Sequence, residues 1–231
     1  NNSDGPDFNY SWNCGAEGPS RKKAVLALRN GQVRNAFKLL LTAQGTPCLL
    51  AGDEFFNSQK GNNNVYCQDN ETGWVDWSRL KTDDSLFRYV KRLIEFRKNH
   101  PCLHRSEELR GLDRTACGVP DVSFHGENAW QINAEVVSRQ LGVMYSGSDV
   151  GDGECFVAYN MHWLPHTFAL PSPGKQKVWC LISDPDEGIL EGPVLLEEQQ
   201  KLEVKERSIL ILVSRKAEKP SKKTGKRKRD R

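Results

Sequence analysis

The hydrophobic pattern of the chain changes at Pro101, and this change limits the folds that the chain can adopt. Before Pro101, apolar residues recur every three or four positions over long stretches, which predicts helices. After it, short apolar or alternating runs are separated by clusters of Gly, Pro, Asp and Ser, which is typical of an antiparallel β-sandwich. The predicted strands cover residues 121–125, 137–145, 155–161, 167–170, 178–182 and 208–213.

Two helices are predicted before this change. In the first, apolar residues between positions 26 and 41 follow one helix face. The pair Asn30-Gly31 interrupts it, because glycine inside a helix costs about 1 kcal/mol relative to alanine, so the helix begins either near position 20 or after Gly31. The second helix runs from a cap at Thr82 or Asp83 to His100, because the residue before a proline avoids helical geometry.

A short apolar run at residues 46–51 lies between the two helices. It predicts a strand buried on both faces, as in a parallel sheet or a barrel. Asp53 and Glu54 follow the end of this run, and a long polar loop with three consecutive Asn occupies residues 55–80. By spacing alone, the closing unit of a barrel is one of several α/β arrangements that fit, and the fold class is α/β followed by an all-β region.

Composition narrows the classes of function. The net charge is +3, and residues 216–231 hold nine Lys or Arg against two acids. The remainder of the chain is slightly acidic, so we expect no nucleic-acid partner, and a tail that is disordered. The seven cysteines are odd in number and form no C-x-x-C pair, and the five histidines show no metal-ligand spacing. We therefore expect reduced thiols in the cytoplasm, no cofactor, no metal site and no membrane segment.

Three segments carry a resemblance to a known family. The first is NYSWNCG at residues 9–15. The second joins QGTP at 44–47, AGDE at 51–54, GNNN at 61–64 and YCQDN at 66–70. The third and weaker segment is DVSFHG at 121–126 with VAYNMHW at 157–163. In this order they resemble bacterial glycogen-debranching enzymes, the isoamylase branch of the α-amylase superfamily, over about residues 1–213.

The resemblance implies an architecture and an activity. Residues 1–100 would be the C-terminal part of a (β/α)8 barrel whose last strand is at 47–50, residues 101–213 an antiparallel β-sandwich, and residues 214–231 a basic tail. The implied reaction is retaining hydrolysis of α-1,6 branch links, with glycogen or a limit dextrin as partner. The family's catalytic carboxylates follow earlier strands, and its His-Asp pair is absent from this sequence. We therefore expect no catalytic residue in this chain and no hydrolysis by it alone.

Substrate contacts are predicted in the loop that follows the apolar run. The predicted substrate-binding residues are Asp53, Glu54, Asn62, Asn63, Asn64 and Tyr66. Amides match the donors and acceptors of sugar hydroxyls, although consecutive Asn also satisfy turn backbone. The two acids are not expected to form a catalytic pair, because adjacent strand residues point to opposite faces and a retaining pair must lie about 5–5.5 Å apart. A structural role, in which one carboxylate braces the barrel interior and the other fixes the following loop, is favoured over direct sugar contact. Packing is favoured over sugar stacking for the nearby tryptophans at 74 and 77.

Two other functions stay open at this point. A sandwich with exposed aromatic residues can bind glucan without any chemistry, which would make the chain a non-catalytic carbohydrate-binding or interaction module. A transferase of the same superfamily is also compatible with the motifs, because linkage preference depends on other barrel loops.

Overall fold

The computed structural model describes residues 10–132, 138–184 and 188–217. Its helices are α1 (Lys23–Thr42), α2 (Arg79–Thr82) and α3 (Ser85–Asn99), with short 3₁₀ turns η1 (Asp53–Phe55) and η2 (Pro101–Leu103). Its strands are β1 (Val122–His125), β2 (Gln140–Tyr145), β3 (Cys155–Asn160), β4 (His166–Ala169), β5 (Lys177–Asp184), β6 (Gly188–Leu195), β7 (Lys201–Val204) and β8 (Ser208–Lys216).

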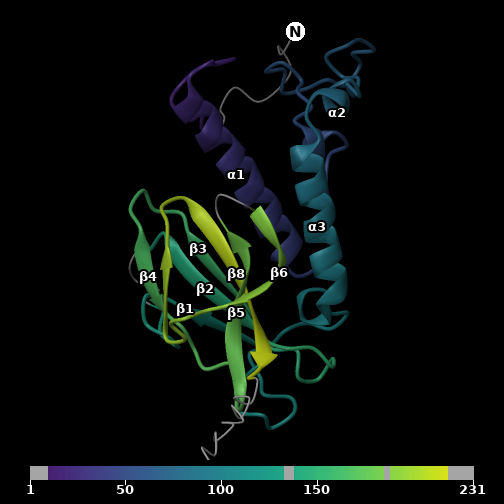
Figure 1. Cartoon of the computed structure of the whole chain (residues 1–231). Helices are drawn as coiled ribbons and strands as arrows, with labels where there is room; N and C mark the ends of the chain where they lie inside the picture. Colours follow the sequence, from purple (N-terminus) through teal and green to yellow (C-terminus); the bar gives the residue numbers. More distant parts are fainter. Residues whose placement is uncertain (1–9, 133–137, 185–187, 218–231) are drawn as a thin grey trace, which may run out of the picture.

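The elements form three layers (Figure 1). Six antiparallel strands make the central sheet, in the order β1-β2-β3-β8-β5-β6, and β4 pairs with β7 in a second small sheet. Helices α1 and α3 lie side by side against one face of the large sheet, and the β4–β7 pair covers the other face. The antiparallel β region predicted from the sequence is confirmed.

The central strands are buried on both faces, because their side chains alternate between two cores. In β8, Ile209 and Ile211 join the cluster beneath the helices, whereas Leu210 and Leu212 join the cluster beneath β4 and β7. All six residues of β3 are buried, and its five apolar side chains alternate between the same two clusters. A strand with period-two side chains needs cover on both sides if every position is apolar, and the helices supply one of these covers.

Polar contacts fix the helices to the sheet within the apolar interface. The Lys38 Nζ donates to the Ile209 carbonyl at 2.7 Å, and the Thr42 hydroxyl lies 3.0 Å from the Tyr159 hydroxyl. The Arg97 guanidinium of α3 donates to carbonyls at the C-terminal end of α1, at 2.9 Å for Leu41. Buried polar groups that are paired in this way restrict α1 to one position on the sheet.

The structure corrects several sequence predictions. Residues 46–51 are not a strand: they lie outside any helix or strand, Leu49 and Leu50 are 39% and 60% exposed, and no described strand pairs with them. The first helix runs through Gly31 without a break. Strands β6 and β7 were not predicted, and β8 continues to Lys216, three residues into the tail that was expected to begin at Ser214.

Position 137 of the second predicted strand and residues 218–231 of the predicted tail lie outside the described residues. In the part of the chain that is described, no helix is both long enough and apolar enough to cross a membrane.

Candidate functional site

Asp53 and Glu54 lie in the 3₁₀ turn η1, and their carboxylates have different surroundings. The turn begins at Gly52, whose φ of +99° is a left-handed conformation that favours glycine. The Oε2 of Glu54 accepts a hydrogen bond from the Gly52 N–H at 2.9 Å. Glu54 therefore braces the backbone of its own turn.

Asp53 instead lines a hollow of about 380 Å³ between α1 and the turn. The other lining groups are mainly apolar and include Phe37, Leu40, Leu49 and Phe56. Burial raises the pKa of Asp53, and the neighbouring charge of Glu54 raises it further. A carboxyl group in this setting retains its proton to higher pH than an exposed aspartate, but Glu54 does not line the hollow with it.

The Asn-rich segment folds into two consecutive side-chain turns. The Oδ1 of Asn62 accepts the Asn64 N–H at 2.9 Å, and the Oδ1 of Asn64 accepts the Tyr66 N–H at 3.1 Å. This is the backbone-satisfying role that short polar side chains adopt in turns. Asn63 is exposed and the Tyr66 ring is 81% exposed, so these two side chains remain accessible to a ligand.

Trp74 and Trp77 were interpreted as packing residues, but most of each side chain is in contact with solvent. Trp74 is 59% exposed and Trp77 is 64% exposed. Both line one hollow of about 420 Å³ in the loop before α2. The sequence signal that could have found this hollow is the presence of two tryptophans three residues apart within a polar loop.

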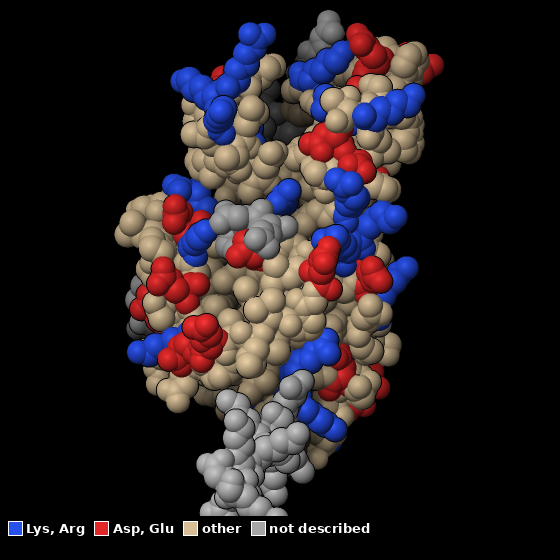
Figure 2. Space-filling view, in the orientation of Figure 1, with Lys and Arg blue, Asp and Glu red and all other residues tan. Residues whose placement is uncertain are grey.

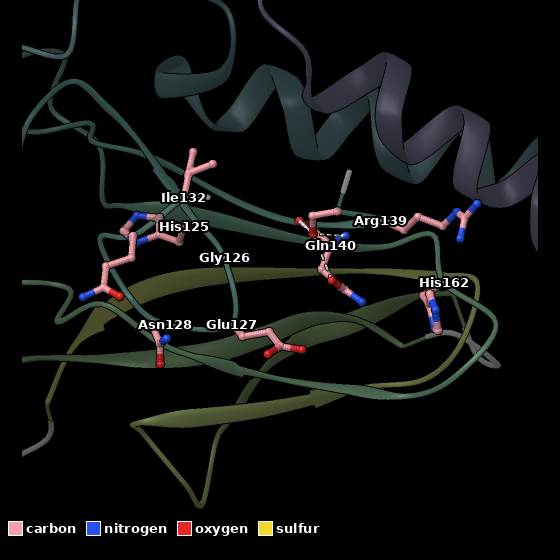
Figure 3. Close-up of a pocket in the computed structure, with 10 residues that line it drawn as sticks. His125, Gly126, Glu127, Asn128, Ile132, Arg139, Gln140 and His162 are labelled. Atoms are coloured by element: carbon pink, nitrogen blue, oxygen red, sulfur yellow. Dashed lines mark hydrogen bonds between the residues drawn. The ribbon is translucent and has the colours of Figure 1, made fainter. Parts of the chain in front are cut away.

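A larger hollow of about 520 Å³ lies on the sandwich (Figure 3). Its polar lining includes Glu127, Arg139 and His162, and Figure 3 shows His125 and His162 at well-separated places along it. Outside the hollow's lining, His166 lies 2.9 Å from the Glu127 carboxylate and 3.1 Å from His162.

The histidines at this hollow do not form a metal centre. The contact between His162 and His166 was not expected from their spacing; it arises where the chain turns between β3 and β4. Burial lowers the pKa of His125 to about 4, so this ring is neutral at ordinary pH. Within the described residues, no group of three or more His, Cys, Asp or Glu side chains could hold a metal ion.

Three curated proteins show what the sequence is similar to. The glycogen operon protein GlgX homolog of Mycobacterium tuberculosis is 31% identical over 227 residues, which is 92% of this chain and 32% of that protein. Isoamylase 3 of rice is 35% identical over 82% of this chain and 22% of its own length. The glycogen debranching enzyme of Dickeya chrysanthemi is 44% identical over 63% of this chain and 22% of its own length.

The chain thus spans about a third or less of the length of these relatives. Among solved structures, apo pullulanase from Paenibacillus barengoltzii superposes with a TM-score of 0.60 at 23% identity, over 84% of this chain and 26% of that one. At this identity the likeness concerns the fold alone. No protein-family model matches the chain.

Proposed function

Because this chain is related to the isoamylase-type glycogen-debranching enzymes, as its motifs indicated, we propose that it is part of a glycoside hydrolase that cleaves α-1,6 branch links of glycogen or limit dextrins with retention. The observation that carries the proposal is the similarity to a glycogen-operon protein along 92% of the chain. The seven cysteines are all free thiols, which agrees with the proposed cytoplasmic location.

We propose that residues 1–100 belong to the catalytic barrel and residues 101–213 to the C-terminal sandwich, which β8 extends to Lys216, so that the basic tail predicted for residues 214–231 starts after this strand. Residues 47–50 form no strand in this structure; in this proposal they become the last strand of the barrel when neighbouring strands from the rest of the protein pair with them. The leucines at 49 and 50 are exposed, and an apolar hollow lies beside α1. A barrel strand without its neighbours presents such surfaces, because its ladder hydrogen bonds and its core contacts come from those neighbours.

The two acids of η1 do not supply the cleaving pair in this proposal. A retaining glycosidase needs one carboxylate as nucleophile and one as acid and base, facing each other across the glycosidic bond. The hydrogen bond from Gly52 ties Glu54 to the backbone, while Asp53 alone lines the hollow. Asp53, Asn63 and Tyr66 are the proposed sugar contacts with accessible groups, and Asn62 and Asn64 hold the loop that presents them.

The experiment that tests this proposal uses the protein encoded by the complete reading frame that contains this chain. Incubated with β-limit dextrin, it is expected to release reducing ends and linear chains, and proton NMR should show the α-anomer first. Linear amylose is the control substrate and should give no product. Disproportionation of linear malto-oligosaccharides without net release of reducing ends would favour the transferase instead.

A second measurement separates the hydrolase from a binding module. The 231-residue chain alone should release no reducing sugar from the same substrate. If the full-length protein also releases none but is retarded in a glycogen-containing gel, the hydrolase proposal is wrong and the non-catalytic module is favoured.

A further inference from the structure

The exposed tryptophans of the loop before α2 are held in fixed orientations. The Nε1 of Trp74 donates to the Asp69 carboxylate at 2.9 Å. The Trp77 ring packs against the buried ring of Phe55, with 5.5 Å between centroids. Two aromatic rings whose orientations are fixed by specific contacts form a prepared apolar surface.

The rest of the hollow offers polar groups whose charges balance. Lys60 and Arg79 carry positive charges, and Glu71 and Asp76 carry negative charges. Lys60 pairs with Glu71 at 2.9 Å, and Arg79 lies 3.5 Å from Asp76. Figure 2 shows acidic and basic side chains interspersed over the lobe around α2. A lining of this kind favours neither anions nor cations, but it provides many donors and acceptors for a neutral ligand.

The loop that carries these groups is closed by its own hydrogen bonds. The Asp76 N–H donates to the Oδ1 of Asn57 at 2.9 Å, and the Arg79 Nη1 donates to the Phe56 carbonyl at 2.5 Å. Both contacts join residues about twenty positions apart, so the hollow is a feature of the folded loop and not of one turn. Its volume of about 420 Å³ lies in the lower part of the range of roughly 300–1,000 Å³ for ligand pockets.

We propose that Trp74 and Trp77 form an α-glucan subsite separate from the Asn-rich turn, in which pyranose rings stack on the indoles and sugar hydroxyls bond to the charged rim. A pyranose ring has one apolar face and a neutral, hydroxyl-rich edge, and the hollow matches both properties. This assignment deepens the proposed function and rests on it for the identity of the sugar. The ligand class is a linear α-1,4-linked malto-oligosaccharide of a branch.

The test measures maltoheptaose binding to the 231-residue chain by isothermal titration and by retardation in glycogen gels. Trp74→Ala and Trp77→Ala should each weaken binding about tenfold or more, as truncation of a central aromatic contact does. Trp163→Ala is the matched control, because this tryptophan is 52% exposed on the sandwich and lies outside the hollow. It should bind as the unchanged chain does.

Circular dichroism and the urea midpoint establish that each variant is folded. If Trp77→Ala loses its fold through the Phe55 contact, Trp77→Phe and Trp74→Ala supply the same comparison. Unchanged binding in the folded variants, or no binding by the unchanged chain, would overturn the subsite. Loss of binding in the variants supports it even if the full-length protein fails to hydrolyse β-limit dextrin, so the two proposals fail independently.

Discussion

Replacing the buried Lys38 tests how the helix layer is attached to the sheet. Lys38 is 2% exposed, and its Nζ contacts the Ile209 carbonyl within the interface. Burial lowers the pKa of Lys38 from 10.5 to about 8; attraction to Asp184 opposes this shift, and repulsion from Arg34 adds to it. Folding therefore favours the neutral amine, whereas the unfolded chain keeps the proton up to its ordinary pKa.

The sign and size of the effect follow from proton linkage. Below pH 8 both states hold the proton, so the free energy of unfolding does not change through this group. Between about 8 and 10.5 the unfolded chain binds more protons than the folded chain, so stability rises with pH, by up to about 1.4 kcal/mol per unit. Between pH 7 and pH 9.5 the gain due to Lys38 amounts to about 2 kcal/mol.

The assay compares the unchanged chain with Lys38→Met by urea unfolding under reducing conditions at a series of pH values from about 7 to about 9.5. Buried tyrosines and cysteines also make stability depend on pH toward the alkaline end. Burial raises the pKa of Tyr159 to about 12 and that of Cys155 above its ordinary value, so these groups ionise in the unfolded chain before they do so in the folded chain. These contributions occur in both proteins and cancel in the difference. Lys23→Met, which replaces an exposed lysine on the same helix, is the matched control.

As pH rises, the free energy of unfolding of the unchanged chain is expected to increase relative to that of Lys38→Met. A difference that stays constant across the series would contradict the reasoning, because it would mean that Lys38 has the same pKa in both states and is not desolvated by α1 and β8.

Three further predictions concern stability. Asp121→Asn should cost about 2 kcal/mol, because the buried carboxylate accepts three backbone N–H groups and an arginine N–H. Burial would raise the pKa of Asp121, but these hydrogen bonds outweigh burial and lower the pKa. The unchanged chain should therefore keep this stability above pH 3.8 and lose it as pH falls through the lowered pKa, and identical acid-unfolding midpoints for the two proteins would contradict this. Gly52→Ala should cost about 2 kcal/mol in urea unfolding, because the backbone has a φ of +99° and a Cβ would lie 2.5 Å from a neighbouring side chain. Gly45→Ala is the control, because Gly45 also has a positive φ but a Cβ there would meet open space, so this change should cost less. Equal losses of stability would exclude the clash at Gly52. Trp179→Ala should cost about 3–5 kcal/mol in the same assay. Trp163→Ala removes a half-exposed ring that stacks on His162 and lies under Arg139, and should cost about 1 kcal/mol. Similar costs would contradict the assignment of Trp179 to the core.

Helices α1 and α3 and most strands could be predicted because their side chains repeat with a regular period, whereas the one-turn helix α2 was not predicted. The uninterrupted apolar run of β8 and the amphipathic stripe of α3 are signals of this kind. Strand β6 lies at the edge of the sheet and contains Glu191, Gly192 and Pro193, which are exposed there. A proline is tolerated on an edge strand because one side of the strand needs no ladder partner, but in the sequence it indicates a break.

The incorrect strand at residues 46–51 has a different cause. Apolar composition indicates that a segment can be buried, but a strand exists only when another strand satisfies its N–H and C=O groups. The sequence of one segment does not say whether that partner is present. Helix α1 shows the converse case: Gly31 suggested a break, yet packing of Phe37 and Leu41 against the sheet outweighs the local cost.

Part of the candidate site could likewise be predicted from the sequence, and part could not. The turn role of Asn62 and Asn64 was recognised as an alternative because it depends on neighbours two residues away. The hollow around Trp77 depends on a contact with Phe55, twenty-two positions earlier, and loop closure at that distance leaves no periodic signal. The turns of the Asn-rich segment could therefore be anticipated from the local sequence, whereas the hollow at Trp74 and Trp77 could be found only in the folded loop.

The helices and the six-stranded sheet share a single apolar cluster, and this limits how the segment can be inherited. Leu93 of α3 and Ile211 of β8 belong to the same cluster, although the boundary that we propose between barrel and sandwich, at residue 100, falls between them. A recombination event at that boundary would join helices and strands whose surfaces had not evolved together. Exchange of the sandwich between related enzymes therefore requires that helices α1 and α3 be transferred together with it, as one block.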